Sequence, residues 1–273
     1  MTTTDITYLH EWVNNRMVRG LYIFTKEDVL SINLPISHQA LQNSLSRLTE
    51  RGIIMSPWQN FYVIIPMEYR LKGIVPPAFY ISNLMKFLGR DYYVSHLTAA
   101  AYNGASHQRA MVFQAIVNGG PIRSGVKNGT SLEFTRRKQM PMSFVMKVKT
   151  QTGYMNVAGP ELTALDIVDD EKKIGGLSRA AEVLMEMCPS MHWDESKLQL
   201  LPFFSIPTIQ RLGFILEQIE EMDIANALFS LILQDKRAMR KTWLKRSKES
   251  IAKANLNNRW KIIDNYKLEI DDI

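Results

Sequence analysis

The apolar and polar positions between residues 21 and 65 predict a short helix, a turn, a second amphipathic helix and two strands. Thr25 is a residue type that caps helices, and Asp28, three residues later, completes an approximate capping box. Pro35 ends this first helix, because proline lacks the amide proton and disfavours helical geometry in the preceding residue. Ser37 can cap the second helix, which ends before Gly52 and whose apolar residues at near-helical spacing are Ala40, Leu41, Leu45 and Leu48.

Two apolar runs after this helix have the spacing of a β-hairpin. They cover residues 53–55 and 61–65, are joined by a turn at 56–60, and end at Pro66. Helix, turn, helix and hairpin in this order predict a winged helix-turn-helix domain over residues 1–75.

The face of the second helix opposite its apolar residues is polar and suits DNA. Its side chains can donate to phosphates or read base edges if the helix enters a major groove. The candidate DNA-binding residues on this helix are Ser37, His38, Gln39, Gln42, Asn43, Ser46 and Arg47. We also expect contacts from Lys26 in the first helix and from Trp58, Gln59 and Asn60 in the hairpin turn. Domains of this kind also bind proteins without touching DNA, so both partners stay open.

A proline-rich connector at residues 73–77 predicts the start of a second domain, residues 76–273. Helical patterns at 79–88 and 95–103 precede a small antiparallel sheet, roughly 108–158, and a helical bundle follows at roughly 160–255. The predicted strands are 110–117, 131–135, 142–148 and 154–157, and the predicted helices of the bundle are 161–168, 177–187, 196–201, 206–222 and 224–233. The last pattern, 259–264, is a strand that could return to the sheet. The fold class is therefore α+β.

Composition places the chain among ordinary globular proteins. Of its 273 residues, 46% are hydrophobic and 22% charged. The N-terminus lacks the pattern of a signal peptide and no apolar run approaches the roughly 20 residues that span a bilayer, so we expect a cytoplasmic protein without a membrane partner. The single cysteine, Cys188, has apolar neighbours and is expected to be buried.

Charge is segregated along the chain, which says more than the net charge of +6. Residues 1–75 are nearly neutral, 76–160 are strongly basic, 161–235 are strongly acidic and 236–273 are basic. Arg136, Arg137 and Lys138 form a basic cluster that is a candidate for phosphate contacts, and residues 236–248 form a longer basic tract. Both could equally be solvated surface.

A search for catalytic chemistry finds no convincing site. The glycine-rich segment 119–125 lacks the pattern of a phosphate-binding loop and is most simply a turn. The five histidines are scattered, and the acidic run 169–171 is more typical of a solvated helix end than of a metal site. No nucleophile elbow or triad spacing occurs. We therefore expect no enzymatic activity, no catalytic residue, no cofactor and no metal.

The predicted winged helix and three segments after it, in this order, resemble the AbiEi family, the antitoxins of type IV, abortive-infection toxin–antitoxin systems. The three segments are Tyr-Tyr-Val-Ser-His-Leu-Thr-Ala-Ala-Ala-Tyr-Asn-Gly at 92–104, a segment with Pro-Glu-Leu-Thr-Ala-Leu-Asp at 155–168, and Arg-Leu-Gly-Phe-Ile-Leu-Glu at 211–217. The resemblance implies a phage-defence protein whose winged helix represses its own operon at inverted repeats, while its C-terminal domain counteracts a nucleotidyltransferase-like toxin. It also implies that basic residues such as Arg136, Arg137 and Lys138 help to hold DNA.

Residues in these segments also have ordinary structural interpretations. Glu161 and Thr163 are expected to be structural, Leu162 and Leu165 to lie in the core, and Arg211 to pair with or cap near Glu217. Glu161, in the first turn after Pro160, would compensate the helix dipole.

The alternative function is a protein-interaction adaptor that binds no DNA and uses the winged helix and the acidic helices. The sequence leaves open the operator, the host specificity of the defence, direct contact with the toxin and DNA contact by residues 236–248. We expect a monomer in solution, with pairing on DNA left open; two copies on an inverted repeat would place their helices roughly 34 Å apart.

Overall fold

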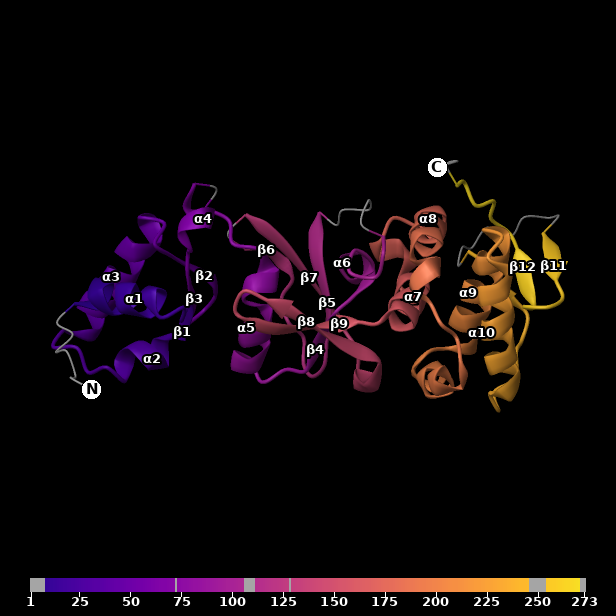
Figure 1. Cartoon of the computed structure of the whole chain (residues 1–273), viewed down its shortest axis with the longest axis horizontal. Helices are drawn as coiled ribbons and strands as arrows, with labels where there is room; N and C mark the ends of the chain where they lie inside the picture. Colours follow the sequence, from indigo (N-terminus) through magenta and orange to yellow (C-terminus); the bar gives the residue numbers. More distant parts are fainter. Residues whose placement is uncertain (1–7, 72, 106–110, 128, 246–253, 271–273) are drawn as a thin grey trace.

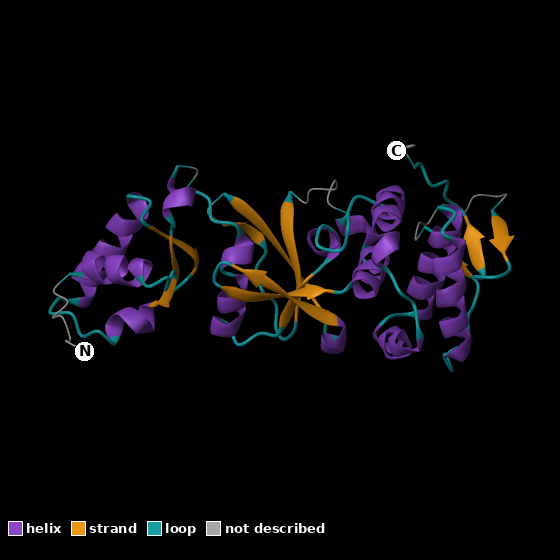
Figure 2. Ribbon diagram, viewed as in Figure 1, coloured by secondary structure: helices purple, strands orange, loops and turns teal. Residues whose placement is uncertain are grey.

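The computed structural model describes residues 8–71, 73–105, 111–127, 129–245 and 254–270. The N-terminal elements, the central sheet and the C-terminal helices follow one another along the longest axis (Figure 1). Three sheets are present in the described part, one at each end and a larger one in the middle (Figure 2). The mixture of helices and separate sheets confirms the α+β class. No helix in the described ranges is long and apolar enough to cross a membrane.

The N-terminal part combines three helices with a three-stranded antiparallel sheet. The helices are α1 (Leu9–Val18), α2 (Lys26–Leu30) and α3 (His38–Glu50), and the strands are β1 (Ile23–Thr25), β2 (Ile54–Trp58) and β3 (Phe61–Ile64) in the order β1-β3-β2. The predicted capping box is present, since the Thr25 hydroxyl accepts from the Asp28 amide at 3.1 Å and the Asp28 carboxylate accepts from the Thr25 amide at 2.7 Å. The polarity pattern predicted neither α1, whose apolar and polar residues are poorly segregated, nor β1, which has only three residues.

These elements enclose a small apolar core of their own. Leu41, Leu45 and Leu48 of α3 meet Val13 of α1 and Ile54 of β2 there. The hairpin turn is shorter than predicted, because β2 continues through Pro57 to Trp58 with an irregular register. Proline is tolerated at this position since β2 is an edge strand.

A six-stranded sheet forms the middle of the molecule, and it is mixed rather than antiparallel as predicted. Its strands are β4 (Tyr92–Val94), β5 (Val112–Val117), β6 (Gly125–Lys127), β7 (Thr130–Arg136), β8 (Val145–Thr150) and β9 (Gly153–Ala158), in the order β6-β7-β5-β4-β9-β8. The pairs β5–β7 and β4–β9 are parallel. Strand β6, which was not predicted, reverses the chain between β5 and β7, so these two neighbours run in the same direction.

Helices connect to this sheet and continue beyond it. They are α4 (Met67–Arg70), α5 (Ile81–Phe87), α6 (His96–Ala100), α7 (Pro160–Asp169), α8 (Leu177–Met187), α9 (Ile206–Gln218) and α10 (Met222–Gln234), with short 3-10 turns η1 (Pro77–Phe79), η2 (Met142–Phe144), η3 (Glu171–Lys173) and η4 (Cys188–Ser190). The predicted strand 142–148 therefore begins only at Val145. The predicted helix 196–201 is the 3-10 helix η5 (Glu195–Phe203), which contains Pro202.

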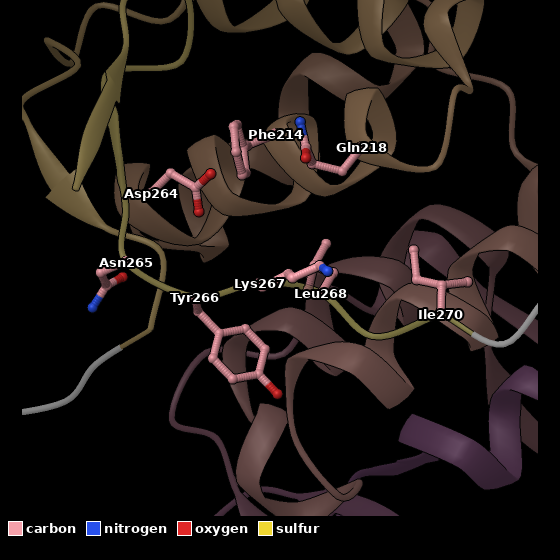
Figure 3. A pocket seen from close by; sticks show the side chains of 8 residues that line it. All are labelled: Phe214, Gln218, Asp264, Asn265, Tyr266, Lys267, Leu268 and Ile270. Carbon is pink, nitrogen blue, oxygen red and sulfur yellow. The ribbon is translucent and has the colours of Figure 1, made fainter. Parts of the chain in front are cut away.

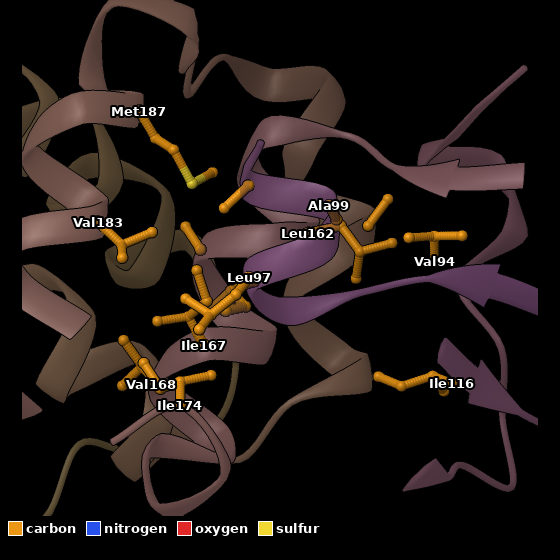
Figure 4. Close-up of a cluster of buried hydrophobic side chains, with 14 of the residues drawn as sticks. Val94, Leu97, Ala99, Ile116, Leu162, Ile167, Val168, Ile174, Val183 and Met187 are labelled. Atoms are coloured by element: carbon orange, nitrogen blue, oxygen red, sulfur yellow. The ribbon is translucent and has the colours of Figure 1, made fainter. Parts of the chain in front are cut away.

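The main core lies where α6, α7 and α8 meet the sheet. Leu97, Leu162 and Val183 come from the three helices, while Val94 and Ile116 come from the sheet (Figure 4). All five are buried. This packing joins the sheet and the helices that follow it into one unit.

The C-terminal segment forms a separate sheet instead of returning to the central one as predicted. Its strands are β10 (Thr242–Trp243), β11 (Asn255–Asn257) and β12 (Ile262–Asp264), in the order β10-β12-β11. Strand β12 packs against α9. Cys188 is 2% exposed, as expected, and burial raises the pKa of its thiol to about 12.

Candidate nucleic-acid interface

Helix α3 presents one polar face to solvent because Leu41, Leu45 and Leu48 point into the N-terminal core. The Ser37 hydroxyl accepts a hydrogen bond from the Ala40 amide at 3.2 Å, so the predicted N-cap is present. All seven predicted residues of this helix and its cap are exposed: Ser37, His38, Gln39, Gln42, Asn43, Ser46 and Arg47. The structure therefore places these side chains on the accessible surface of one element.

Two hydrogen bonds link side chains along this polar face. The Gln39 amide donates to the Asn43 side-chain oxygen at 3.2 Å. The Ser46 hydroxyl donates to the Glu50 carboxylate at 3.1 Å. Glu50 was not among the predicted site residues, although its position four residues after Ser46 puts it on the same face. Its charge would repel a nearby phosphate, and its oxygens can accept from a cytosine amino group.

The hairpin turn lies close to the start of α2. Gln59 and Asn60 are exposed, and Asn60 takes a left-handed backbone conformation with φ of 62°. The Lys26 backbone amide donates to the Asn60 carbonyl at 2.9 Å, which brings Lys26 beside the turn. Trp58, in contrast, is half-buried and packs against the main core. Its ring is partly withdrawn from the surface that Gln59 and Asn60 occupy.

The predicted basic cluster at the end of β7 is divided between surface and interior. Arg136 and Lys138 are exposed. The Arg137 side chain is 13% exposed, and its Nη1 lies 2.6 Å from Asp166 Oδ1 and 2.7 Å from the Tyr93 hydroxyl. The Arg137 guanidinium is therefore committed to the interior, and only its two neighbours face solvent.

Asp166 and Arg137 form the centre of a buried charge network. The Arg137 guanidinium also lies over the Phe204 ring at 4.5 Å and approaches Asp169 at 3.8 Å. Burial raises the pKa of Asp166, and the Arg137 charge offsets part of this effect. Burial also raises the pKa of Tyr93, and the nearby Asp166 charge raises it further, so the Tyr93 hydroxyl stays protonated. The network ties α7 to the sheet.

A second polar group lies at the end of α7, where a solvated acidic run was predicted. His96 is 1% exposed, has a left-handed φ of 51°, and places Nε2 at 3.1 Å from Asp170 Oδ2. Burial alone would raise the pKa of Asp170, but the hydrogen bond and charge of His96, with help from Lys173, lower it. Ser95 occupies the N-cap position of α6, yet its hydroxyl pairs with His96 Nδ1 at 2.8 Å instead of capping the helix. Asp170 is therefore paired rather than free in solvent.

The basic tract 236–248 is largely irregular in its described part. Lys236, Arg240, Lys241 and Lys245 are exposed. Arg237 pairs with Asp235 at 2.6 Å and donates to two backbone carbonyls. Arg246 and Lys248 lie outside the described residues.

Two further candidate features are a hollow beside α9 and groups of side chains that could bind a metal ion. A hollow of about 370 Å³ separates α9 from the segment after β12, with Phe214 and Gln218 on one side and Tyr266 on the other (Figure 3). Among the described residues, no group of three or more His, Cys, Asp or Glu side chains could hold a metal ion. The glycine-rich segment 119–125 connects β5 to β6.

A comparison with known protein families covers part of the second predicted domain. Residues 93–218 match the model of the AbiEi antitoxin C-terminal domain. This region belongs to the AbiEi antitoxin family. The match supports an antitoxin role within a toxin–antitoxin system.

Comparisons beyond this AbiEi domain concern the fold. No curated protein matches the sequence. The RV2827C protein from Mycobacterium tuberculosis is similar over 93% of this chain and 92% of its own, with a TM-score of 0.65 and 13% identity. A nucleotidyltransferase-like protein from Paracoccidioides brasiliensis is similar over 55% of this chain and 89% of its own, with a TM-score of 0.39 and 12% identity.

The segments that carry the AbiEi resemblance have structural roles. Pro160 occupies the first turn of α7, Leu162 and Leu165 are core residues, and Thr163 donates to the Ala158 carbonyl, as expected for structural positions. Glu161 pairs with Lys197 at 3.4 Å and accepts from the His192 amide at 2.6 Å, so its role is structural but is not limited to the helix dipole.

In the third segment the predicted link between Arg211 and Glu217 is replaced by contacts with the C-terminal segment. The Arg211 guanidinium donates to the carbonyls of Trp243 and Leu244, at 2.9 and 3.0 Å. Glu217 pairs with Arg259 at 2.7 Å. This part of α9 therefore holds the C-terminal residues in place. Because the partners are distant in sequence, the local pattern could not indicate this role.

Proposed function

We propose that this protein is a DNA-binding antitoxin of a type IV toxin–antitoxin system. In this proposal, residues 1–75 are a winged helix-turn-helix domain that represses the protein's own operon. Residues 76–273 are the antitoxin domain, which counteracts a nucleotidyltransferase-like toxin. The single observation that carries the DNA-binding part is the exposed polar face of α3, which projects from a small core beside a hairpin.

The groups on this face suit base edges and phosphates. Asn43 and Gln39 can each make a paired contact with adenine, and Arg47 can pair with guanine or a phosphate. Gln59, Asn60 and Lys26 lie together at the hairpin turn, where a wing meets the DNA backbone. Arg136 and Lys138 supply further positive charge from the second domain, and Arg137 does not, because it pairs with a buried carboxylate.

The near neutrality of the N-terminal domain limits its affinity. Phosphate contacts supply most of non-specific binding, and each adds to the salt dependence. A domain with few cations therefore gains most from the cations of the second domain and from a second copy on an inverted repeat.

The test is fluorescence anisotropy of the full chain on labelled DNA from upstream of its own gene, at several salt concentrations. Scrambled DNA of the same length is the control duplex. The Asn43→Ala/Arg47→Ala variant removes two groups from the α3 face. The matched control Asn14→Ala/Arg19→Ala removes the same residue types from an exposed position in α1 and from the exposed residue that follows this helix. We expect salt-dependent binding that prefers the upstream DNA, collapses in the first variant and survives in the second.

Equal weak binding to both duplexes, unchanged in the Asn43→Ala/Arg47→Ala variant, would contradict the proposal. It would favour the adaptor, for which the Glu50 carboxylate on the same face is the supporting observation. The antitoxin part has a separate test in growing cells. We expect expression of the adjacent toxin gene alone to arrest growth. Co-expression of this protein should restore growth, even when α3 carries the two substitutions.

A further inference from the structure

A pocket lies beside the polar face of α3, between this helix and the start of α1. Its volume is about 230 Å³. It is lined by Tyr8, Leu9, His10, Ser44, Arg47, Leu48 and Arg51. No carboxylate is among these residues, whereas two arginines are. The pocket therefore has the charge and the hydrogen-bond donors that suit an anion.

The two arginines that line the pocket come from the last turn of α3 and from its C-cap. Arg47 and Arg51 are four residues apart, and such positions are neighbours on a helix surface. Both are exposed, and within the described ranges neither forms an ion pair with a carboxylate. The nearest acid in sequence, Glu50, accepts from Ser46 instead. Both guanidinium groups remain available to a ligand.

Two aromatic side chains, Tyr8 and His10, also line the pocket. The rings of Tyr8 and His10 stack with centroids 5.7 Å apart at an angle of 29°. The phenol hydroxyl and an imidazole N–H can each donate to an oxygen of a bound anion. Donors from two helices thus surround one small volume.

We infer that this pocket binds one phosphodiester of duplex DNA, an inference that rests on the proposed function. A helix with its side chains is about 10–12 Å wide and fills a major groove about 12 Å wide. Residues at the flanks of such a helix therefore face the sugar–phosphate backbone. Arg47 belongs to both the polar face and the pocket, and Arg51 continues the same flank, so the pocket lies where the backbone passes.

The test compares Arg51→Ala with Arg19→Ala, which removes the exposed arginine that directly follows α1 and lies outside the pocket. Binding of the full chain to upstream and scrambled DNA is measured by anisotropy across a salt series. Arg51→Ala is expected to weaken both complexes by the same factor, about tenfold at low salt, as for one charge-assisted hydrogen bond. The salt slope becomes shallower by about 0.9, the effect of one phosphate contact. A second variant, Tyr8→Phe/His10→Ala, is expected to weaken both complexes in the same sequence-independent way.

The outcomes separate this inference from the proposed function. If the unmodified protein prefers upstream DNA and Arg51→Ala leaves affinity and salt slope as in Arg19→Ala, the pocket inference is overturned while the function stands. If Arg51→Ala removes only the preference for upstream DNA, the pocket reads bases and the inference is also overturned. If the unmodified protein does not prefer upstream DNA, the proposed function fails first.

Discussion

Replacing Gly213 with alanine tests how α9 holds the C-terminal segment. A Cβ atom at Gly213 would lie 2.1, 2.3 and 2.3 Å from three carbons of the Trp260 ring. Trp260 is fully buried, its backbone carbonyl accepts from Gln210 at 2.6 Å, and its ring meets Phe229 edge-on at 5.1 Å. The ring is therefore fixed in place on several sides.

Two opposing effects set the size of the change. Alanine gains about 1 kcal/mol of helix propensity over glycine in a helix interior. The nearest ring carbon, however, would have to move by about 1.4 Å, the difference between 2.1 Å and the roughly 3.5 Å of an ordinary carbon contact. Overpacking of this kind costs about 1–3 kcal/mol, and the fixed ring places the cost near the upper value. We expect Gly213→Ala to lower the free energy of unfolding by about 2 kcal/mol.

Urea unfolding followed by far-UV circular dichroism measures this change without depending on tryptophan fluorescence. Ser230→Ala, an exposed position of α10, is the control, because it gains helix propensity without meeting a ring. Gly213→Ala/Trp260→Leu should lose less stability than the two single changes together, since the smaller side chain relieves the clash. A Gly213→Ala protein as stable as the unmodified one would refute the reasoning that the glycine is needed to admit Trp260.

The remaining predictions concern the charge networks and the cysteine. Arg137→Ala should lower the free energy of unfolding in urea by about 3 kcal/mol, because it leaves buried Asp166 without its partner. The control Arg136→Ala should change this free energy by no more than about 0.5 kcal/mol. Equal effects of the two changes would contradict the inward position of Arg137. The folded pKa of Asp170 lies below its unfolded value of about 3.9, so its contribution is full above that value and is lost as pH falls through the folded pKa. Asp170→Asn should therefore flatten the loss of stability as the pH falls below about 4, and an unchanged acid profile would count against the pairing. Cys188, with its raised pKa and burial, should react with a thiol reagent at pH 8 only after unfolding, and rapid reaction in native buffer would show that the thiol is accessible.

Predictions from sequence were most accurate where the signal was local. The capping residues Thr25 and Ser37, the limits of α3 and α8, and the proline at the start of α7 all follow from a few neighbouring residues. The exposure of the α3 polar face follows from the same periodicity. Its role in DNA binding stays a prediction.

Other features depended on residues distant in sequence. Arg136 and Arg137 look alike in the chain, but only Arg137 meets Asp166, 29 residues later. His96 meets Asp170 across 74 residues, and Glu217 meets Arg259 across 42. No local pattern carries this information.

The sequence by itself determined where most helices begin and end, which face of α3 stays polar, and that the chain is α+β. Only the tertiary structure decided that the central sheet is mixed, that Arg137 points inward, and that the C-terminal strand forms its own sheet on α9. The physical reason is the distance along the sequence between the residues that interact. Helix periodicity and helix caps depend on residues within one or two turns of each other. Strand order and buried ion pairs depend on which distant segments the core brings together.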